Sequence, residues 1–230
     1  MPATFALIPG AGGSAWYWHL VTPLLTAAGH DAIAVELPAA DATADLDAYA
    51  DTVVRAVANA REPLVVVAQS MGAFTAPIVA SRRPVAMIVL VNPMVPLAGE
   101  SPGQWWTATG QSAARSEYFS RIGLGDRAFD EVEDYFHDVP AAVRAEALRQ
   151  PEPEQADAPF ERAWPLDAWP DVPTRVLQGS DDRLFPLEFQ RRVARDRLGC
   201  DVDVMPGGHL SSLSQPQVLA TRLLEYLSES

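Results

Sequence analysis

A serine stands at the end of a short apolar run, where the sequence from Val65 to Gly72 reads VVVAQSMG. The small residues Ala68 and Gly72 flank Ser70 at two positions on either side. A strand that turns into a helix within one residue leaves no room for larger side chains there, and its apical serine is pushed into solvent. The pattern predicts a nucleophile elbow, with alanine in the position usually held by the first glycine. The alternative is a buried strand followed by an ordinary serine N-cap.

A serine hydroxyl becomes a nucleophile at neutral pH only with a base within hydrogen-bond reach, and a carboxylate must orient that base. The chain has four histidines. His209 ends the loose sequence PGGH after the last strand-like run, which is where such a base belongs. His19 and His30 flank the first helical stretch, where surface or capping roles suffice. His137 lies in a middle segment, where it could contact a substrate, although packing within that segment is the favoured explanation. The alternative for His209 is a solvated loop histidine.

The candidate acids are two neighbouring aspartates, Asp181 and Asp182, which follow the penultimate strand-like run. One of them could instead cap the next helix or pair with Arg183. The residues leave this choice open. The order serine, acid, histidine is that of the doubly wound hydrolases, which carry the acid and the base on loops after late strands.

A glycine-rich loop, residues 10–13, follows the first apolar run. In acyl transfer, such a loop can point backbone N–H groups at the developing oxyanion. We expect the N–H groups of Ala11 and Met71 to form this oxyanion hole. The alternative is a dinucleotide-binding loop, but the G-x-G-x-x-G pattern would need a glycine where Ala15 stands.

The elements that position these residues alternate between apolar runs and amphipathic stretches. Strands are predicted at Thr4–Ile8, Asp31–Leu37, Val65–Gln69, Val85–Val91, Thr174–Gln178 and Asp201–Met205, and helices at Trp16–Ala28, Ala44–Arg61, Met71–Arg82, Leu187–Leu198 and Gln215–Ser228. Continuously apolar strands that alternate with helices indicate a parallel sheet covered on both faces. We therefore predict the α/β class, with a doubly wound, mostly parallel sheet of about six strands.

The alternation stops in residues 93–169, which contain four tryptophans and a proline-rich polar run. A stretch of this length is too long for a loop without structure of its own. We predict a helical cap at 93–169, inserted into a core formed by residues 1–92 and 170–230. Within the cap, helices are predicted at about Ser112–Ile122 and Pro140–Arg149.

The charge and the cysteine content of the chain argue against several classes of function. The net charge is −13 and no lysine is present, which argues against nucleic acid and anionic membrane partners. Cys200 is the only cysteine, so neither a disulfide nor a cysteine-based zinc site is expected, and no cluster with metal-ligand spacing is visible. We expect no metal or organic cofactor. Neither a secretion signal nor an apolar run of membrane-spanning length is visible, so we expect a cytoplasmic protein. We expect it to be a monomer or homodimer.

Three stretches of the chain carry a family resemblance. Pro9–Trp18, PGAGGSAWYW, resembles the His-Gly-Ala-x-His-Gly-x-Trp-x-Trp opening of the small plant-type methylesterase and hydroxynitrile lyase group of α/β-hydrolases, which has bacterial relatives. Leu24–His30 and Pro186–Arg191 resemble that group's Leu-Leu-x-x-x-Gly-His and Pro-Glu-Glu-Phe-Gln-Arg sequences. The resemblance covers nearly the whole chain and implies the α/β-hydrolase fold. It also places the acid at Asp182, with Asp181 as a neighbour.

The chain departs from the family pattern at several positions. Pro9 stands where the family has a histidine before the oxyanion glycine, and the elbow begins with Ala68. The lyase branch uses a lysine after the catalytic histidine and a threonine in the oxyanion loop. Those positions are Leu210 and Gly10 here, which disfavours cyanohydrin cleavage by that mechanism.

Together these features predict a serine esterase that cleaves a small or medium carboxylic ester, with a methyl ester or lactone as options. Ser70 would attack, His209 would act as base and Asp182 would orient it. The predicted substrate contacts are Gly10, Trp105, Trp106, Phe136, His137 and Leu210, although packing within the cap explains any one of the aromatic residues equally well. Two alternatives stay open: a cofactor-free lyase or cyclase that uses the same three residues for acid–base chemistry, and a non-catalytic small-molecule binder.

Overall fold

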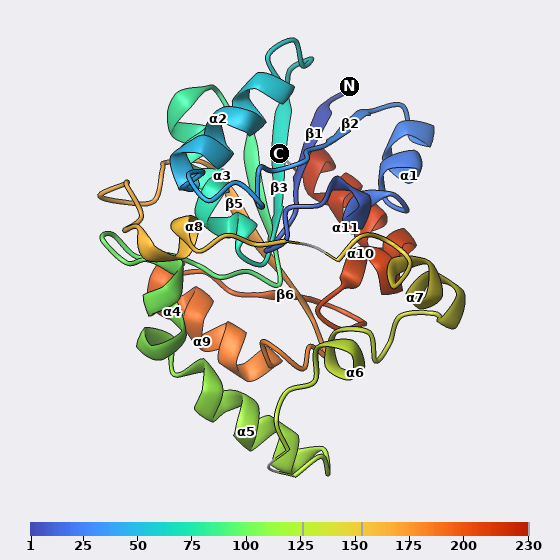
Figure 1. The fold of residues 1–230 in the computed structure, drawn as a ribbon. Helices are drawn as coiled ribbons and strands as arrows, with labels where there is room; N and C mark the ends of the chain where they lie inside the picture. Colours follow the sequence, from blue (N-terminus) through green and yellow to red (C-terminus); the bar gives the residue numbers. More distant parts are fainter. Residues whose placement is uncertain (126, 153, 230) are drawn as a thin grey trace.

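A computed structural model describes residues 1–125, 127–152 and 154–229. Its centre is a sheet in the order β2-β1-β3-β4-β5-β6, and every pairing within it is parallel (Figure 1). The strands are β1 Thr4–Ile8, β2 Asp31–Ala34, β3 Leu64–Gln69, β4 Met87–Val91, β5 Thr174–Gly179 and β6 Asp203–Met205. The predicted fold class, including the parallel six-stranded sheet, is confirmed.

Helices cover both faces of the sheet because alternate residues of a strand point to opposite faces, where they belong to two separate apolar clusters. In β1, Ala6 and Ile8 belong to one cluster, while Phe5 and Leu7 belong to the other. The first cluster packs against α2, α3 and α9, and the second against the 3-10 helix η1, α1 and α11 (Figure 1). These elements are η1 Ala15–Trp18, α1 Thr22–Ala27, α2 Leu46–Ala56, α3 Gly72–Arg82, α9 Leu187–Leu198 and α11 Pro216–Ser228, with the short α10 at Ser211–Ser214. This arrangement is the doubly wound architecture.

The segment between β4 and β5 holds more helices than the sequence predicts. Its described residues form α4 Pro102–Thr109, α5 Gln111–Arg121, α6 Glu131–Tyr135, α7 Ala141–Ala147 and α8 Ala158–Glu161. Only α5 and α7 correspond to predicted helices. In α4, Ser101 and Gln104 form a capping box that fixes the first turn. The indoles of Trp105 and Trp164 are buried in the same apolar cluster as the sheet, so this segment shares the core.

The prediction of one continuous helix at Trp16–Ala28 is wrong, because the structure has two separate helices there, η1 and α1. Pro23 lies in the first turn of α1. A proline there lacks an N–H donor, and its ring would clash with the carbonyl four residues earlier in a continuous helix. The predicted strand Asp31–Leu37 also ends early, at Ala34. The N–H of Leu37 instead donates to the oxygen of Gly13, which joins this segment to the glycine-rich loop.

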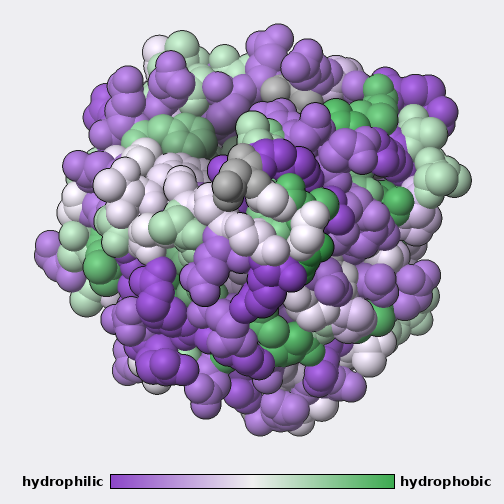
Figure 2. Space-filling view, turned by 90° about the horizontal axis from the view of Figure 1, so that it is seen from below, coloured by the Kyte–Doolittle hydropathy of each residue, from purple (hydrophilic) through white to green (hydrophobic). Residues whose placement is uncertain are grey.

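The carboxyl ends of the strands, at the lower end of the sheet in Figure 1, lie side by side. In the register of the sheet, Ala68 of β3 lies opposite Ile8 of β1 and Leu90 of β4. The loops that follow these strands must therefore meet, as in other open α/β sheets. Hydrophilic residues cover most of the surface on this side, with small apolar areas scattered among them (Figure 2). None of the described helices combines the length and apolar character that crossing a membrane requires.

Candidate active site

Ser70 lies at a sharp turn between β3 and α3. Its φ is 51°, in the left-handed region that residues other than glycine rarely adopt. Its N–H donates to the Val91 oxygen at 3.0 Å, which holds the turn against β4. A Cβ at Gly72 would lie 2.6 Å from the Pro9 carbonyl oxygen, so only glycine fits there. Ala68 is fully buried, and its methyl is accommodated.

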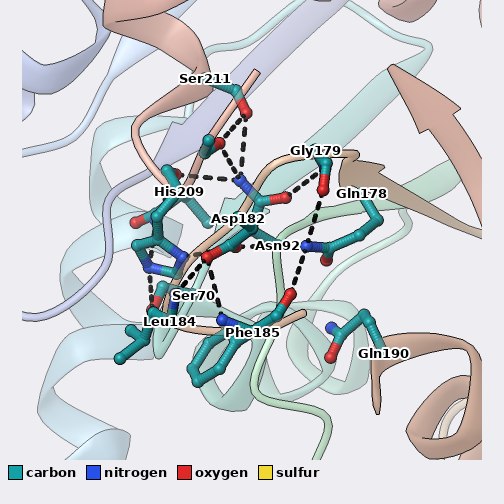
Figure 3. Close-up of polar contacts among 12 residues, drawn as sticks. Ser70, Asn92, Gln178, Gly179, Asp182, Leu184, Phe185, Gln190, His209 and Ser211 are labelled. Carbon is teal, nitrogen blue, oxygen red and sulfur yellow. Dashed lines mark hydrogen bonds and ion pairs between the residues drawn. The ribbon is translucent and has the colours of Figure 1, made fainter. Parts of the chain in front are cut away.

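The loops after β3, β5 and β6 bring Ser70, Asp182 and His209 together (Figure 3). His209 Nδ1 lies 2.8 Å from Asp182 Oδ2, and His209 Nε2 lies 3.1 Å from Ser70 Oγ. Ser70 is 8% exposed, His209 3% and Asp182 0%. Asp181 does not join this chain of hydrogen bonds, because its carboxylate accepts from the Ser180 hydroxyl at 2.7 Å.

The carboxylate of Asp182 is held by protein donors on both oxygens. Oδ1 accepts the N–H groups of Leu184 and Phe185 at 2.8 and 2.9 Å. Oδ2 accepts from Gln178 Nε2 at 3.2 Å as well as from His209. These fixed donors orient the carboxylate toward Nδ1 of His209. With its proton on Nδ1, the imidazole presents the Nε2 lone pair to Ser70.

Asn92, which follows β4, links the histidine loop to β5 (Figure 3). Its Nδ2 donates to the carbonyl oxygens of Gly208 and His209 at 3.1 and 2.9 Å and to Ser211 Oγ at 3.0 Å. Its Oδ1 accepts the Gly179 N–H at 2.8 Å. The side chain is fully buried and its φ is 47°. No motif in the sequence marks this residue, although it holds the backbone on which His209 sits.

Replacing Asn92 by aspartate is expected to lower the free energy of unfolding by about 2–4 kcal/mol. A carboxylate oxygen would then face two carbonyl oxygens that now accept hydrogen bonds, with no cation to neutralise it. Urea unfolding at pH 7 measures the effect. The matched control is Asn59→Asp at an exposed position, which should change stability by less than about 0.5 kcal/mol. Equal stability of the two variants would show that Asn92 does not hold these loops.

The glycine-rich loop after β1 lies against Ser70. A Cβ at Gly10 would be 3.0 Å from Ser70 Cβ, and the loop is held by a hydrogen bond from the Gly12 N–H to Gln155 Oε1 at 2.9 Å. Within the described residues, the N–H groups of Ala11 and Met71 donate to no protein acceptor. Neither donor predicted for the oxyanion hole is therefore committed to a protein acceptor, and their role stays a prediction.

Two aromatic rings lie beside His209, and neither is among the predicted substrate contacts. Phe185 and Tyr135, which no sequence motif marks, have ring centroids 5.0 and 5.5 Å from the His209 ring. Trp105 is fully buried, and its ring packs 5.1 Å from that of Phe185. Trp105 therefore packs against Phe185 inside the core, and no part of its side chain is exposed to contact a substrate. Trp106 is partly exposed, 5.8 Å from the same Phe185 ring.

The remaining predicted substrate contacts lie around the histidine loop. Phe136 and Leu210 are half-buried and pack against the apolar cluster that contains α11. A Cβ at Gly208 would lie 2.5 Å from His137 Nε2, so His137 adjoins the backbone just before His209. The next residue, Asp138, accepts the Gly208 N–H at 2.6 Å.

An ion-pair cluster connects α6 to the loop that carries Asp182. Arg183 Nη1 lies 3.3 Å from Asp134 Oδ1, and Arg127 forms two hydrogen bonds to the same carboxylate. Burial alone would raise the pKa of Asp134, but the hydrogen bonds from Arg127 and from the Asp130 N–H lower it on balance. The side chain of Asp134 is 0% exposed, so this is a buried, charge-assisted link. In the described part of the chain, no group of three or more His, Cys, Asp and Glu side chains is placed to hold a metal ion.

Residues 5–222 match the Alpha/beta hydrolase family, and the chain belongs to that family. The likeness to plant methylesterases that the sequence suggests is also confirmed. Methylesterase 3 of Arabidopsis thaliana is 23% identical over 248 residues, covering 95% of this chain and 94% of that protein. Probable esterase PIR7A of Oryza sativa subsp. indica is 34% identical over 110 residues, which span only 43% of this chain and 42% of the rice protein.

Solved structures show the same fold. A pyrethroid hydrolase from Sphingobium faniae JZ-2 aligns with a TM-score of 0.76 over 98% of this chain and 97% of its own. The two sequences are 20% identical, so the comparison bears on fold rather than on substrate.

Proposed function

We propose that this protein is a serine hydrolase that cleaves a small or medium carboxylic ester, with methyl esters and lactones in its range. The observation that carries the proposal is the hydrogen-bonded series Ser70–His209–Asp182, with Ser70 at the tip of a strained strand-to-helix turn. Acyl transfer requires a serine hydroxyl within hydrogen-bond reach of an imidazole that a carboxylate orients, and these contacts support that assignment. The names of the relatives, which include a methylesterase and a probable esterase, support the same class of reaction.

The proposed mechanism follows from these contacts. Ser70 Oγ attacks the ester carbonyl as its proton passes to His209 Nε2, and Asp182 stabilises the imidazolium that forms. The N–H groups of Ala11 and Met71 stabilise the oxyanion, where loss of one such donor typically costs about 10²- to 10³-fold in rate. His209 then protonates the departing alcohol, and water activated by the same imidazole releases the acid.

The proposed substrate site lies between the Ser70 turn and the segment 93–169, which we assign as the cap. Phe185, Trp106 and Tyr135 would form apolar walls beside His209. Burial, with Glu131 and Asp182 nearby, raises the pKa of the Tyr135 hydroxyl, so this phenol stays protonated at neutral pH. It would offer a neutral hydrogen-bond donor at the edge of an otherwise apolar pocket.

Pre-steady-state hydrolysis of p-nitrophenyl acetate and butyrate tests the proposal. We expect a burst of p-nitrophenol followed by slower turnover, and one acyl group on the peptide that contains Ser70 by mass spectrometry. A folded protein that turns over these esters without an acyl-enzyme would point to direct acid–base chemistry by the same residues. Absence of turnover and of acylation, including with methyl esters and lactones, would contradict the hydrolase and favour a lyase, a cyclase or a binder.

A further inference from the structure

Gln69 shares the reactive nitrogen of His209 with the proposed nucleophile. This residue precedes Ser70 in the chain and is 4% exposed. Its Nε2 lies 3.1 Å from His209 Nε2 and 3.4 Å from the His209 carbonyl oxygen. The Ser70 hydroxyl also lies 3.1 Å from His209 Nε2. Two donors therefore converge on one imidazole nitrogen.

A neutral imidazole offers a single acceptor site when its other nitrogen carries the proton. The hydrogen bond from His209 Nδ1 to Asp182 keeps the proton on Nδ1, so Nε2 carries the one lone pair that can accept. Ser70 and Gln69 cannot both make a full hydrogen bond to it at once. In the imidazolium state, by contrast, Nε2 itself becomes a donor. It can donate to Ser70 Oγ, but the Gln69 amide N–H then faces a second donor instead of a lone pair.

The space for this amide depends on the neighbouring loop. A Cβ at Gly10 would lie 2.3 Å from Gln69 Oε1, so any side chain at position 10 would displace the Gln69 side chain. Gly10 thus makes room for the amide whose N–H group points at His209. The glycine and the glutamine form one structural unit beside the Ser70 turn.

We propose that Gln69 is a positioning residue, whose amide N–H holds the His209 lone pair in the resting protein and yields it to Ser70 when substrate binds. The amide N–H competes with the Ser70 hydroxyl for the one lone pair of the neutral imidazole. This role rests on the proposed function, in which His209 is the base. Gln69 would then be a second residue, besides Asp182, that positions the His209 imidazole.

Other groups near His209 act on different atoms of the residue or of its loop. Asp182, on the loop after β5, accepts from Nδ1, and Tyr135 of α6 places its ring beside the imidazole. Asp138 and His137, which follow α6, contact Gly208. Among the described residues, only Ser70 and Gln69 bond to Nε2. A change at Gln69 therefore removes one of the two bonds to this nitrogen, together with the longer bond to the His209 carbonyl oxygen.

The variant Gln69→Met keeps the length of the side chain and removes the amide. We expect the acidic midpoint of the kcat/KM profile for p-nitrophenyl butyrate to move to higher pH by about 0.5–1 unit, the size of one ordinary net hydrogen bond. The sign follows because a donor to the neutral base disfavours its protonation, and removing that donor makes protonation easier. The matched control is Gln190→Met on α9, which also loses a buried bond, from Gln190 Nε2 to the Pro93 oxygen at 2.6 Å. Its midpoint should stay within about 0.2 unit of the parent.

A measurement that needs no turnover separates this proposal from the proposed function. In the Ser70→Ala protein, the ring resonances of His209 can be titrated by NMR with and without Gln69→Met. We expect the added substitution to raise the titration midpoint by about 0.5–1 unit. An unchanged midpoint, with both proteins folded by circular dichroism, would overturn the proposal. A lower midpoint would overturn it too, because it would mean that the amide oxygen faces Nε2 and stabilises the imidazolium.

Discussion

Replacing Ser70 by alanine is expected to lower kcat/KM for p-nitrophenyl butyrate by at least about 10³-fold. The substitution removes the Oγ that lies 3.1 Å from His209 Nε2, and no other described hydroxyl bonds to that nitrogen. The proposed oxyanion donors and aromatic walls remain, so any residual rate reports what those groups contribute without a nucleophile. The burst and the acyl-enzyme should both disappear.

The fold should survive this change. Alanine keeps a Cβ at the position where φ is 51°, so the backbone conformation is neither relieved nor made worse. Thermal unfolding measured beside the kinetics establishes that the loss is chemical. Ser81→Ala, on the exposed side of the same helix α3, is the matched control and should keep full activity. A Ser70→Ala protein that still hydrolyses the ester at more than about a tenth of the parent rate would exclude Ser70 as nucleophile.

Replacing Asp182 by asparagine is expected to lower kcat by about 10⁴-fold, as in serine hydrolases of unrelated fold. The reason lies in the fixed donors around the carboxylate. The N–H groups of Leu184 and Phe185 point at Oδ1 and would select the amide oxygen at that position. The amide nitrogen would then face His209 Nδ1, which must become an acceptor. The imidazole proton would shift to Nε2, where it blocks acceptance from Ser70.

The same substitution also places the new amide nitrogen opposite Gln178 Nε2, another donor, 3.2 Å from the present oxygen. The steady-state rates of Asp182→Asn and Asp181→Asn make a matched pair, because the two aspartates are neighbours of different function. Asp181 is exposed and bonds to Ser180, so its variant should retain the parent rate within about threefold. If Asp182→Asn lost less than about tenfold, the orienting role of Asp182 would be wrong.

The sequence predicts the meeting of Ser70, Asp182 and His209 because the underlying signals are local. Small residues around Ser70 mark a sharp turn, and each of the other two residues follows a short strand. Parallel strands of one sheet end at the same edge, so residues just beyond them converge. The choice of Asp182 over Asp181 came from family resemblance, since both lie at that edge and only the register of the loop separates them.

Other parts of the site could not be predicted, since they depend on contacts between distant residues. Asn92 bonds to residues 87 to 119 positions away, and a single asparagine after a strand carries no periodic or spacing signal. Gln69 reaches a residue 140 positions away. The short helices α6 and α8 do not follow from apolar periodicity: an Asp130 cap begins α6, whereas α8 has no side-chain cap and packs against α4. Trp105 illustrates the remaining ambiguity, because an aromatic in an inserted segment can line a pocket or fill a core.

The segment between β4 and β5 is fastened to the core at the loops that carry the proposed chemistry. Gln155 accepts the Gly12 N–H of the glycine-rich loop, and Asp138 accepts the Gly208 N–H beside His209. Asp134 pairs with Arg183, next to Asp182. The segment proposed to cover the substrate thus also holds in place the glycine-rich loop beside Ser70 and the loops that carry Asp182 and His209.

This fastening limits how the protein can change over evolutionary time. An inserted segment with its own core could be exchanged between homologues by recombination, carrying a new specificity with it. Here such an exchange would remove supports from three loops at once, so the segment is not an independent module. New substrate preferences would have to arise by single substitutions among the enclosing aromatic residues, with the anchoring Gln155, Asp138 and Asp134 inherited unchanged.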